Sequence, residues 1–461
     1  MISPMILKWG GTYFQYFRKN YDCGNVSKEI KTPLDRKHLL NREGEFQCRP
    51  RCSQNGKDGL LYSQFVALVL TGCVGGKGNS SGEASNSANA PNAAEGQAEG
   101  KVKIGVLLPY TGTFAPLTDS IQKGFDLFVE VNGGQLGGRK AEVIYKDTEA
   151  NPQTALRNYR QLVRGDKVDL LVGPVSSSVA YALRDEVEKD KILLINANAS
   201  ASDLSWNKKS AYVYRVSYSG WQQGSSGAKY IAENIGKRAI TVAPSYPAGQ
   251  EVMNAFKTAF EAAGGKVIDQ LWPELNTNDY APQLTQIANE KPDVVFSFLA
   301  GSDQIRFTQQ YSEFGLKNSI PLTGNNNYAD FAFTNAVGKA SEGIIASTQY
   351  TPWLENEVNK KFVEDYQKKY GKMPDMFSEQ GYVSALAIDQ AISKANSTKT
   401  KDLIQVLSGI TLNAPRGTII LDPKTNNPIQ DFYITDSNES ACGPGYIGFF
   451  ASPRQYFLSR I

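Results

Sequence analysis

Short apolar runs alternate with amphipathic segments from residue 101 to about residue 435. The runs are rich in branched residues and end at glycine, proline or polar turns, which is typical of buried strands in a parallel sheet. The expected strands are 101–109, 141–145, 168–172, 191–195, 212–216, 239–243, 266–270, 293–298, 320–323, 417–422 and 432–434. The expected helices are 121–131, 152–163, 180–187, 222–235, 251–263, 281–289, one from 301 and several within 357–395. This alternation predicts an α/β protein with doubly wound parallel sheets.

The turn after the run 168–172 carries polar groups suited to a ligand. A Gly-Pro pair stops the strand at 173–174, and three serines at 176–178 precede the next helix. In an open α/β sheet, ligands bind at the carboxyl ends of the strands, and a helix N-terminus favours an anion. We therefore predict an anion-binding turn, although serines that only cap the helix would leave the same pattern.

Composition narrows the functional classes. The 461 residues carry 49 basic and 46 acidic side chains, so the net charge of +3 creates no field that would attract nucleic acid. The only histidine is His38, and no cysteine lies between residues 74 and 441. The long central region therefore lacks the parts of a histidine-dependent triad or a thiolate metal site, and we expect neither a metal nor a cofactor.

The two ends of the chain have no sustained helical or strand period over 1–56 and 437–461. The first end contains four potential zinc ligands, but their spacing matches no compact zinc finger. These residues are Cys23, His38, Cys48 and Cys52. We assign neither end a function, and the last stretch is interpreted as a tail or a frame error.

An apolar run over 60–72 is shorter than the roughly 20 residues that span a bilayer, and matches the core of a signal peptide. It ends in Leu-Thr-Gly before Cys73, a sequence that resembles the bacterial lipobox, in which the cysteine is lipidated. Residues 1–72 would then be an extension and signal absent from the mature protein. A signal peptide normally begins with a basic segment close to the initiating methionine. Here only Lys57 is near the apolar run and residue 1 lies far upstream, so we expect translation to start downstream of residue 1. A buried strand with a chance cysteine is the alternative.

Residues 73–100 consist largely of Gly, Ser, Asn and Ala after the cysteine, which is typical of a flexible tether. An anchor, a tether and a folded region in this order support a protein held by lipid at the extracytoplasmic face of the cell membrane.

Several short motifs, in this order, resemble the leucine/isoleucine/valine-binding protein family. They are Gly-Pro-x-Ser-Ser at 173–177, Tyr-x-x-Gly at 246–249, Gly-Ser-Asp at 301–303, Gly-Thr-Ile-Ile-Leu-Asp-Pro at 417–423 and Asn-Pro-Ile-Gln-Asp-Phe-Tyr at 427–433. The resemblance implies a type I periplasmic-binding fold, with two doubly wound lobes joined by three crossovers near Ser217, Tyr350 and Thr411. Lobe 1 would hold 101–217 and 350–410, and lobe 2 would hold 218–349 and 411–436.

The resemblance also implies a ligand site. In the amino-acid binders of the family, the ligand carboxylate meets hydroxyl residues after the third and fourth strands, which match Ser177 and Ser200. The Asn198 carbonyl and the Ser200 backbone N–H lie beside them, and Tyr246 would close over the ligand from the second lobe.

One departure concerns the ligand ammonium. The amino-acid binders supply an acid after the strand 320–323, where this chain has glycine and then asparagines, including Asn325. Asp303 is an alternative countercharge from a neighbouring turn. Aromatic residues near predicted loop ends could line an apolar pocket or could simply pack the lobe edges. They are Tyr110, Phe114, Trp221, Tyr246 and Tyr350.

These features predict a monomeric, lipid-anchored solute-binding protein that delivers a small carboxylate to an ABC permease and its ATPase. A ligand-sensing ectodomain is the second possibility, but the chain shows no transmembrane segment or output domain. An α/β enzyme is the third, and the folded region contains no Gly-x-Gly-x-x-Gly, P-loop or Gly-x-Ser-x-Gly motif.

Overall fold

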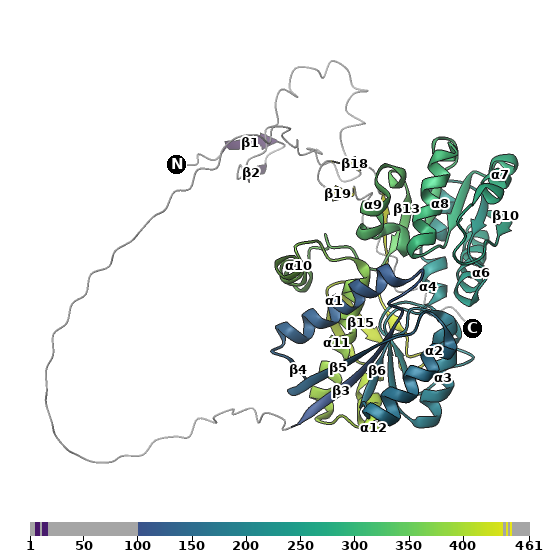
Figure 1. Ribbon diagram of the computed structural model, residues 1–461. Helices are drawn as coiled ribbons and strands as arrows, with labels where there is room; N and C mark the ends of the chain where they lie inside the picture. Colours follow the sequence, from purple (N-terminus) through teal and green to yellow (C-terminus); the bar gives the residue numbers. More distant parts are fainter. Residues whose placement is uncertain (1–4, 10–11, 17–99, 437–438, 441–442, 445–461) are drawn as a thin grey trace, which may run out of the picture. The chain divides into compact units, whose positions relative to one another are not determined.

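The computed structural model describes residues 5–9, 12–16, 100–436, 439–440 and 443–444 (Figure 1). The chain divides into two units, Met1–Ala90 and Pro91–Ile461. Cys73, the four potential zinc ligands and the proposed signal and tether lie outside the described residues.

The first 56 residues show no sustained strand period in the sequence, but the structure has two short strands there. In the first unit, β1 (Met5–Trp9) pairs antiparallel with β2 (Thr12–Tyr16). The sequence between them is Gly-Gly, a dipeptide that favours two-residue hairpin loops. The period was missed because each strand has only five residues.

The first large sheet of the second unit has six strands in the order β4-β5-β3-β6-β7-β8, and β3, β5, β6, β7 and β8 run parallel. The strands are β3 (Lys101–Leu108), β4 (Gln135–Leu136), β5 (Arg139–Asp147), β6 (Leu170–Val172), β7 (Leu193–Asn196) and β8 (Val213–Arg215). Alternate side chains of β3 enter two separate apolar cores. Helices therefore cover both faces of this sheet, as the strand–helix alternation predicts.

The first lobe has two apolar cores. One contains residues of α1, α10, α11 and α12, and the other contains residues of α2 and α3. Their bounds are α1 (Ala115–Val131), α2 (Pro152–Arg160), α3 (Ser177–Asp190), α10 (Glu357–Tyr370), α11 (Met376–Ala395) and α12 (Thr400–Leu407). A π-helical turn, Gln161–Asp166, continues α2. Helices α1 and α11 pack so closely that a Cβ on Gly124 would lie 1.7 Å from the Ser378 carbonyl oxygen.

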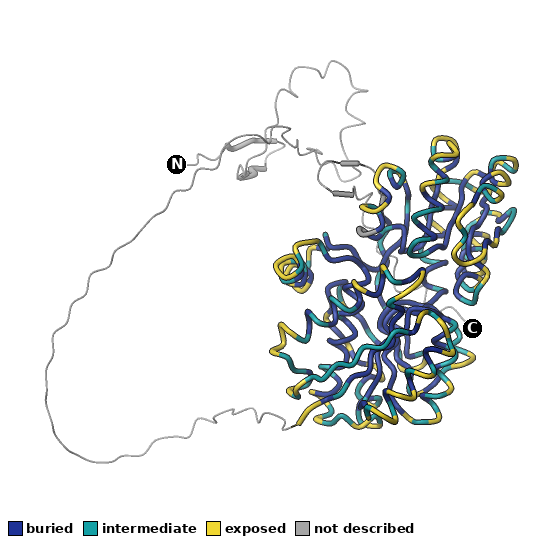
Figure 2. The backbone as a smooth tube through the Cα atoms, viewed as in Figure 1, coloured by how far each residue is buried: buried dark blue, intermediate teal, exposed yellow. Residues whose placement is uncertain are grey.

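The second large sheet has the order β10-β9-β11-β12-β13-β17, in which only β17 runs antiparallel to its neighbour. Its strands are β9 (Arg238–Val242), β10 (Lys266–Leu271), β11 (Val294–Ser297), β12 (Leu322–Gly324), β13 (Ile345–Thr348) and β17 (Tyr433–Asp436). Buried strands again lie inside a layer of helices whose outer turns are exposed (Figure 2).

The helices of this second lobe are α4 (Gly220–Ser225), α5 (Ala228–Asn234), α6 (Pro247–Ala262), α7 (Ala281–Glu290), α8 (Gly301–Glu313) and α9 (Phe331–Val337). The single helix expected over 222–235 is in fact α4 and α5, which are separated at Ser226 and Gly227. No helix among the described residues is long and apolar enough to cross a membrane.

The hairpin near residue 415 belongs to the first lobe, whereas the sequence-based boundary placed 411–436 in the second. Strands β14 (Thr411–Ala414), β15 (Gly417–Leu421) and β16 (Pro428–Ile429) form a separate three-stranded sheet. Leu412 and Ile419 are buried in the core of the first lobe. The small sheet therefore belongs to the first lobe, and only β17 joins the second large sheet. The third crossing of the chain consequently lies after Ile429.

The other two crossings lie between Arg215 and Gly220 and between Thr348 and Glu357. A buried ion pair lies beside the first and third crossings. Arg416 Nε donates to Glu379 Oε1 at 2.8 Å, and the two side chains are 1% and 0% exposed.

Arg416 Nη1 also donates to the Ser217 carbonyl oxygen at 3.2 Å and to Gln430 Oε1 at 2.8 Å. Gln430 Nε2 in turn donates to the same Ser217 oxygen at 2.6 Å. One buried guanidinium thus connects α11 to the first and third crossings.

Candidate ligand-binding site

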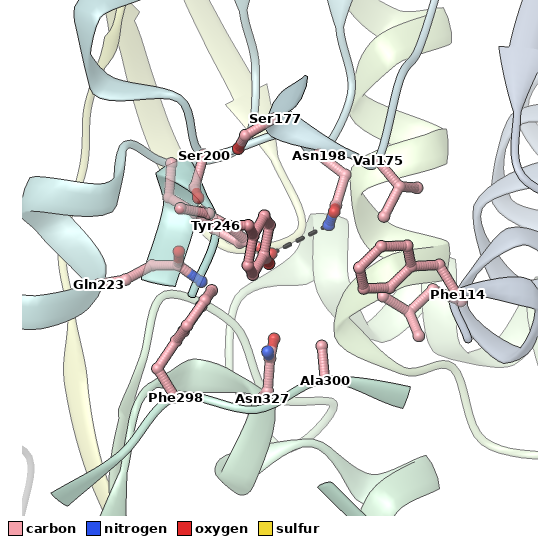
Figure 3. Close-up of a pocket in the computed structure, with 13 residues that line it drawn as sticks. Phe114, Val175, Ser177, Asn198, Ser200, Gln223, Tyr246, Phe298, Ala300 and Asn327 are labelled. Atoms are coloured by element: carbon pink, nitrogen blue, oxygen red, sulfur yellow. Dashed lines mark hydrogen bonds between the residues drawn. The ribbon is translucent and has the colours of Figure 1, made fainter. Parts of the chain in front are cut away.

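A pocket lies where the loops at the carboxyl ends of the two sheets face each other, with about 310 Å³ of empty space, part of it open to solvent (Figure 3). The first lobe contributes Phe114, Leu117, Val175, Ser177, Asn198 and Ser200, the second contributes Gln223, Tyr246, Ala248, Phe298, Ala300 and Asn327, and the first crossing contributes Tyr218.

Ser177 occupies the first turn of α3 and is 1% exposed. Its position depends on Gly173, whose φ is 118° and where a Cβ would lie 2.1 Å from the Leu107 carbonyl oxygen. The N-cap residue Ser176 makes no side-chain capping hydrogen bond, and Ser177 Oγ has no hydrogen-bond partner in the described part of the chain. Within the described part of the chain, Ser177 therefore has an unpaired hydroxyl at the pocket, whereas a buried hydroxyl normally has a partner.

Asn198 and Tyr218 form a positioned polar pair beside Ser200. Asn198 Nδ2 donates to Tyr218 Oη at 2.9 Å and to Gln380 Oε1 at 2.7 Å. Burial raises the pKa of Tyr218 to about 12, so its hydroxyl is neutral at physiological pH. Both amide hydrogens of Asn198 are used within the protein, which holds the loop after β7 in one conformation.

The loop that carries Ser200 is supported by Arg215, which is buried. Arg215 Nη2 donates to the Ala201 carbonyl oxygen at 2.6 Å, and Nη1 donates to the Ala199 carbonyl oxygen and, at 2.9 Å, to that of Tyr218. Burial lowers the pKa of Arg215 to about 10, so it stays cationic at neutral pH. Glu251 offsets part of the Arg215 charge. The N-terminus of α3 favours an anion in the pocket.

The second lobe supplies mainly apolar and neutral surface. Tyr246 immediately precedes α6 and stacks on Phe298 with ring centroids 6.4 Å apart. Burial raises the pKa of Tyr246, so this ring also carries a neutral hydroxyl. Asn327 Nδ2 donates to the Leu299 carbonyl oxygen at 2.9 Å.

Five of the eight ligand residues expected from the sequence line the pocket, namely Phe114, Ser177, Asn198, Ser200 and Tyr246. Three do not line it, namely Tyr110, Asp303 and Asn325. Tyr110 Oη donates to Gln122 Oε1 at 2.8 Å, and Asn325 Nδ2 donates to Asn326 Oδ1 at 2.8 Å.

Asp303 lies outside the pocket lining and has partners of its own. It forms an ion pair with Arg306 and accepts a hydrogen bond from the Asn276 backbone N–H at 2.9 Å. Burial raises the pKa of Asp303, and the contacts with Asn276 and Arg306 oppose that shift. No aspartate or glutamate is among the residues that line this pocket.

Sequence reasoning missed eight lining residues. Val175, Phe298 and Ala300 follow strand ends, so the strand-end rule that located Ser177 would also have found them. Tyr218 also follows a strand, β8, whereas Gln223 had no such signal because it lies on the short helix α4. The remaining three are Leu117, Ala248 and Asn327.

The lobes also touch beside the pocket. Glu251 of α6 accepts hydrogen bonds from Tyr181 Oη of α3 and from the Ser202 backbone N–H, each at 2.5 Å. Both donors belong to the first lobe, so these bonds exist only while the lobes are together. They favour the closed arrangement.

Two α/β lobes that enclose a small pocket define a protein that captures a solute, and the comparisons agree. The model of the periplasmic binding protein family matches residues 101–441, and the chain belongs to this family. The family consists of solute-binding proteins rather than enzymes. The predicted resemblance, the type I fold and the role as an extracytoplasmic solute-binding protein of an ABC transporter are confirmed.

Relatives and solved structures cover the whole folded region. The Leu/Ile/Val-binding protein homolog 6 of Brucella melitensis is 28% identical over 352 residues, 75% of this chain and 90% of the relative. A solute-binding protein of an ABC transporter from R. palustris, in complex with benzoate, has 31% identity and a TM-score of 0.73, covering 76% of this chain and 97% of that one. Another solute-binding protein, from Rhodopseudomonas palustris BisB5 in complex with 3,4-dihydroxy benzoic acid, has 28% identity and a TM-score of 0.72. The match covers 76% of this chain and 96% of that one.

Proposed function

We propose that this protein captures small carboxylates that lack an ammonium group, aromatic acids among them, and delivers them to an ABC permease. One observation carries the proposal: the pocket offers the unpaired Ser177 hydroxyl but has no acidic side chain in its lining. A buried ammonium without a countercharge would cost several kcal/mol. The benzoate-type ligands bound to the two R. palustris proteins support the same class of solute.

Calorimetric titration with paired ligands tests this proposal. We expect benzoate and the keto acid of leucine to bind at least as tightly as leucine, because only leucine must bury an ammonium in a pocket whose lining has no acid. Benzamide is the control, since it keeps the ring of benzoate but not its charge, and we expect it to bind much more weakly. A hundredfold preference for leucine over its keto acid would refute the proposal.

We further propose that lipid on Cys73 holds the protein at the extracytoplasmic face of the membrane, with residues 1–72 removed. The lipobox-like sequence and the polar tether support it. Intact-mass analysis of protein from its native membrane should show a lipidated chain that begins at Cys73, and Cys73→Ala should move the protein to the soluble fraction. A soluble native species that retains residue 1 would contradict it.

A further inference from the structure

Gln223 carries an unsatisfied acceptor at the pocket. This residue of α4 is 2% exposed and lines the pocket from the side of the second lobe (Figure 3). Its Nε2 donates to Asn326 Oδ1 at 2.6 Å, whereas its Oε1 is buried and has no hydrogen-bond partner in the described part of the chain. A buried amide oxygen without a partner is costly, which points to a donor supplied by the ligand.

The orientation of the Gln223 amide follows from its neighbours. Asn326 Nδ2 lies 3.1 Å from Met376 Sδ, and a thioether can only accept a hydrogen bond. Asn326 must therefore direct its NH₂ group toward Met376 and toward Gln349 Oε1, 3.0 Å away. Its Oδ1 then faces Gln223, which must present Nε2 to it. The oxygen of Gln223 is consequently the atom left for the ligand.

The chemistry of this acceptor limits what can satisfy it. An ionised carboxylate has no hydrogen to donate, so the carboxylate of the ligand cannot pair with Gln223 Oε1. An ammonium could donate, but the pocket lining contains no acid to balance its charge. A neutral hydroxyl group donates without introducing a charge.

We propose that Gln223 is a specificity-determining residue, whose Oε1 accepts a hydrogen bond from a hydroxyl group on the bound carboxylate. The protein thereby selects hydroxylated acids over the corresponding acids without a hydroxyl group. This inference rests on the proposed function, since it assumes that a carboxylate occupies the pocket.

Calorimetry on the wild-type protein tests the selectivity. The probes are benzoate against its 2-, 3- and 4-hydroxy derivatives, and phenylacetate against mandelate, so that the hydroxyl group is presented at different positions. We expect at least one hydroxylated acid to bind about tenfold more tightly than its parent, because the parent leaves Gln223 Oε1 unpaired.

Gln223→Met should reduce that preference to within about twofold, because methionine keeps the length of the side chain but removes the acceptor. Gln222→Met is the matched control. Gln222 is 1% exposed, does not line the pocket, and uses its amide within the protein, with Nε2 donating to the Pro428 carbonyl oxygen at 2.9 Å. The control should keep the preference of the wild type.

The outcomes separate this inference from the proposed function. If parent and hydroxylated acids bind equally to the wild type, or if the preference persists in Gln223→Met, the role of Gln223 is overturned while carboxylate binding stands. If none of these carboxylates binds, both are overturned. The wild-type comparison decides the question alone if Gln223→Met does not fold.

Discussion

Replacing Arg416 by methionine is expected to lower the free energy of unfolding by about 3–5 kcal/mol, the usual cost of leaving one member of a buried ion pair alone. Glu379 would remain fully buried without its cation, and the Ser217 carbonyl oxygen would lose one of two donors. Urea denaturation followed by circular dichroism measures the change. Lys361→Met is the control, because its ion pair with Asp365 lies at the surface and should leave the midpoint unchanged.

The double variant Arg416→Met/Glu379→Leu separates charge burial from packing. It should recover much of the stability lost in Arg416→Met, because no unpaired charge remains in the interior. A loss of less than 1 kcal/mol in the single variant would show that Glu379 is protonated or solvated, and would contradict the role assigned to the pair.

Ser177→Ala is expected to weaken binding of benzoate-type carboxylates about 10- to 150-fold without destabilising the ligand-free protein. A hydrogen bond to a charged group contributes about 1.5–3 kcal/mol, which gives that range of affinity. The stability should stay the same or rise, because the variant removes a buried hydroxyl that has no partner among the described residues. Calorimetry and urea denaturation measure the two effects on the same sample.

Ser178→Ala is the matched control for the helix N-terminus. Ser178 is the next residue of α3, is less buried than Ser177 and does not line the pocket. Its replacement should leave the affinity unchanged. If Ser177→Ala binds as the wild type does, or if it lowers stability by more than its control, the Ser177 hydroxyl has a structural role instead.

The sequence by itself determined the layered architecture and one side of the pocket. The spacing of apolar residues predicts which segments are strands and which are helices, because side chains repeat with a different period along each kind of backbone. The carboxyl ends of parallel strands meet at one edge of a sheet, so polar turns after two strands predict a common site. The serine turn at 176–178 was located in this way, the family resemblance named Ser177 and Ser200, and the structure brings both to the same pocket.

The tertiary structure decided which polar groups are paired and which are left for a ligand. Asp303 was a reasonable countercharge in the sequence, but the fold places it against Arg306 and outside the pocket lining. The hairpin β14–β15 joins the first lobe because its apolar face packs there, which no local period reveals. Gln223 donates to Asn326, more than a hundred residues away, whereas Gln222 donates to Pro428. Hydrogen-bond satisfaction depends on such distant partners, and only the folded chain brings them into contact.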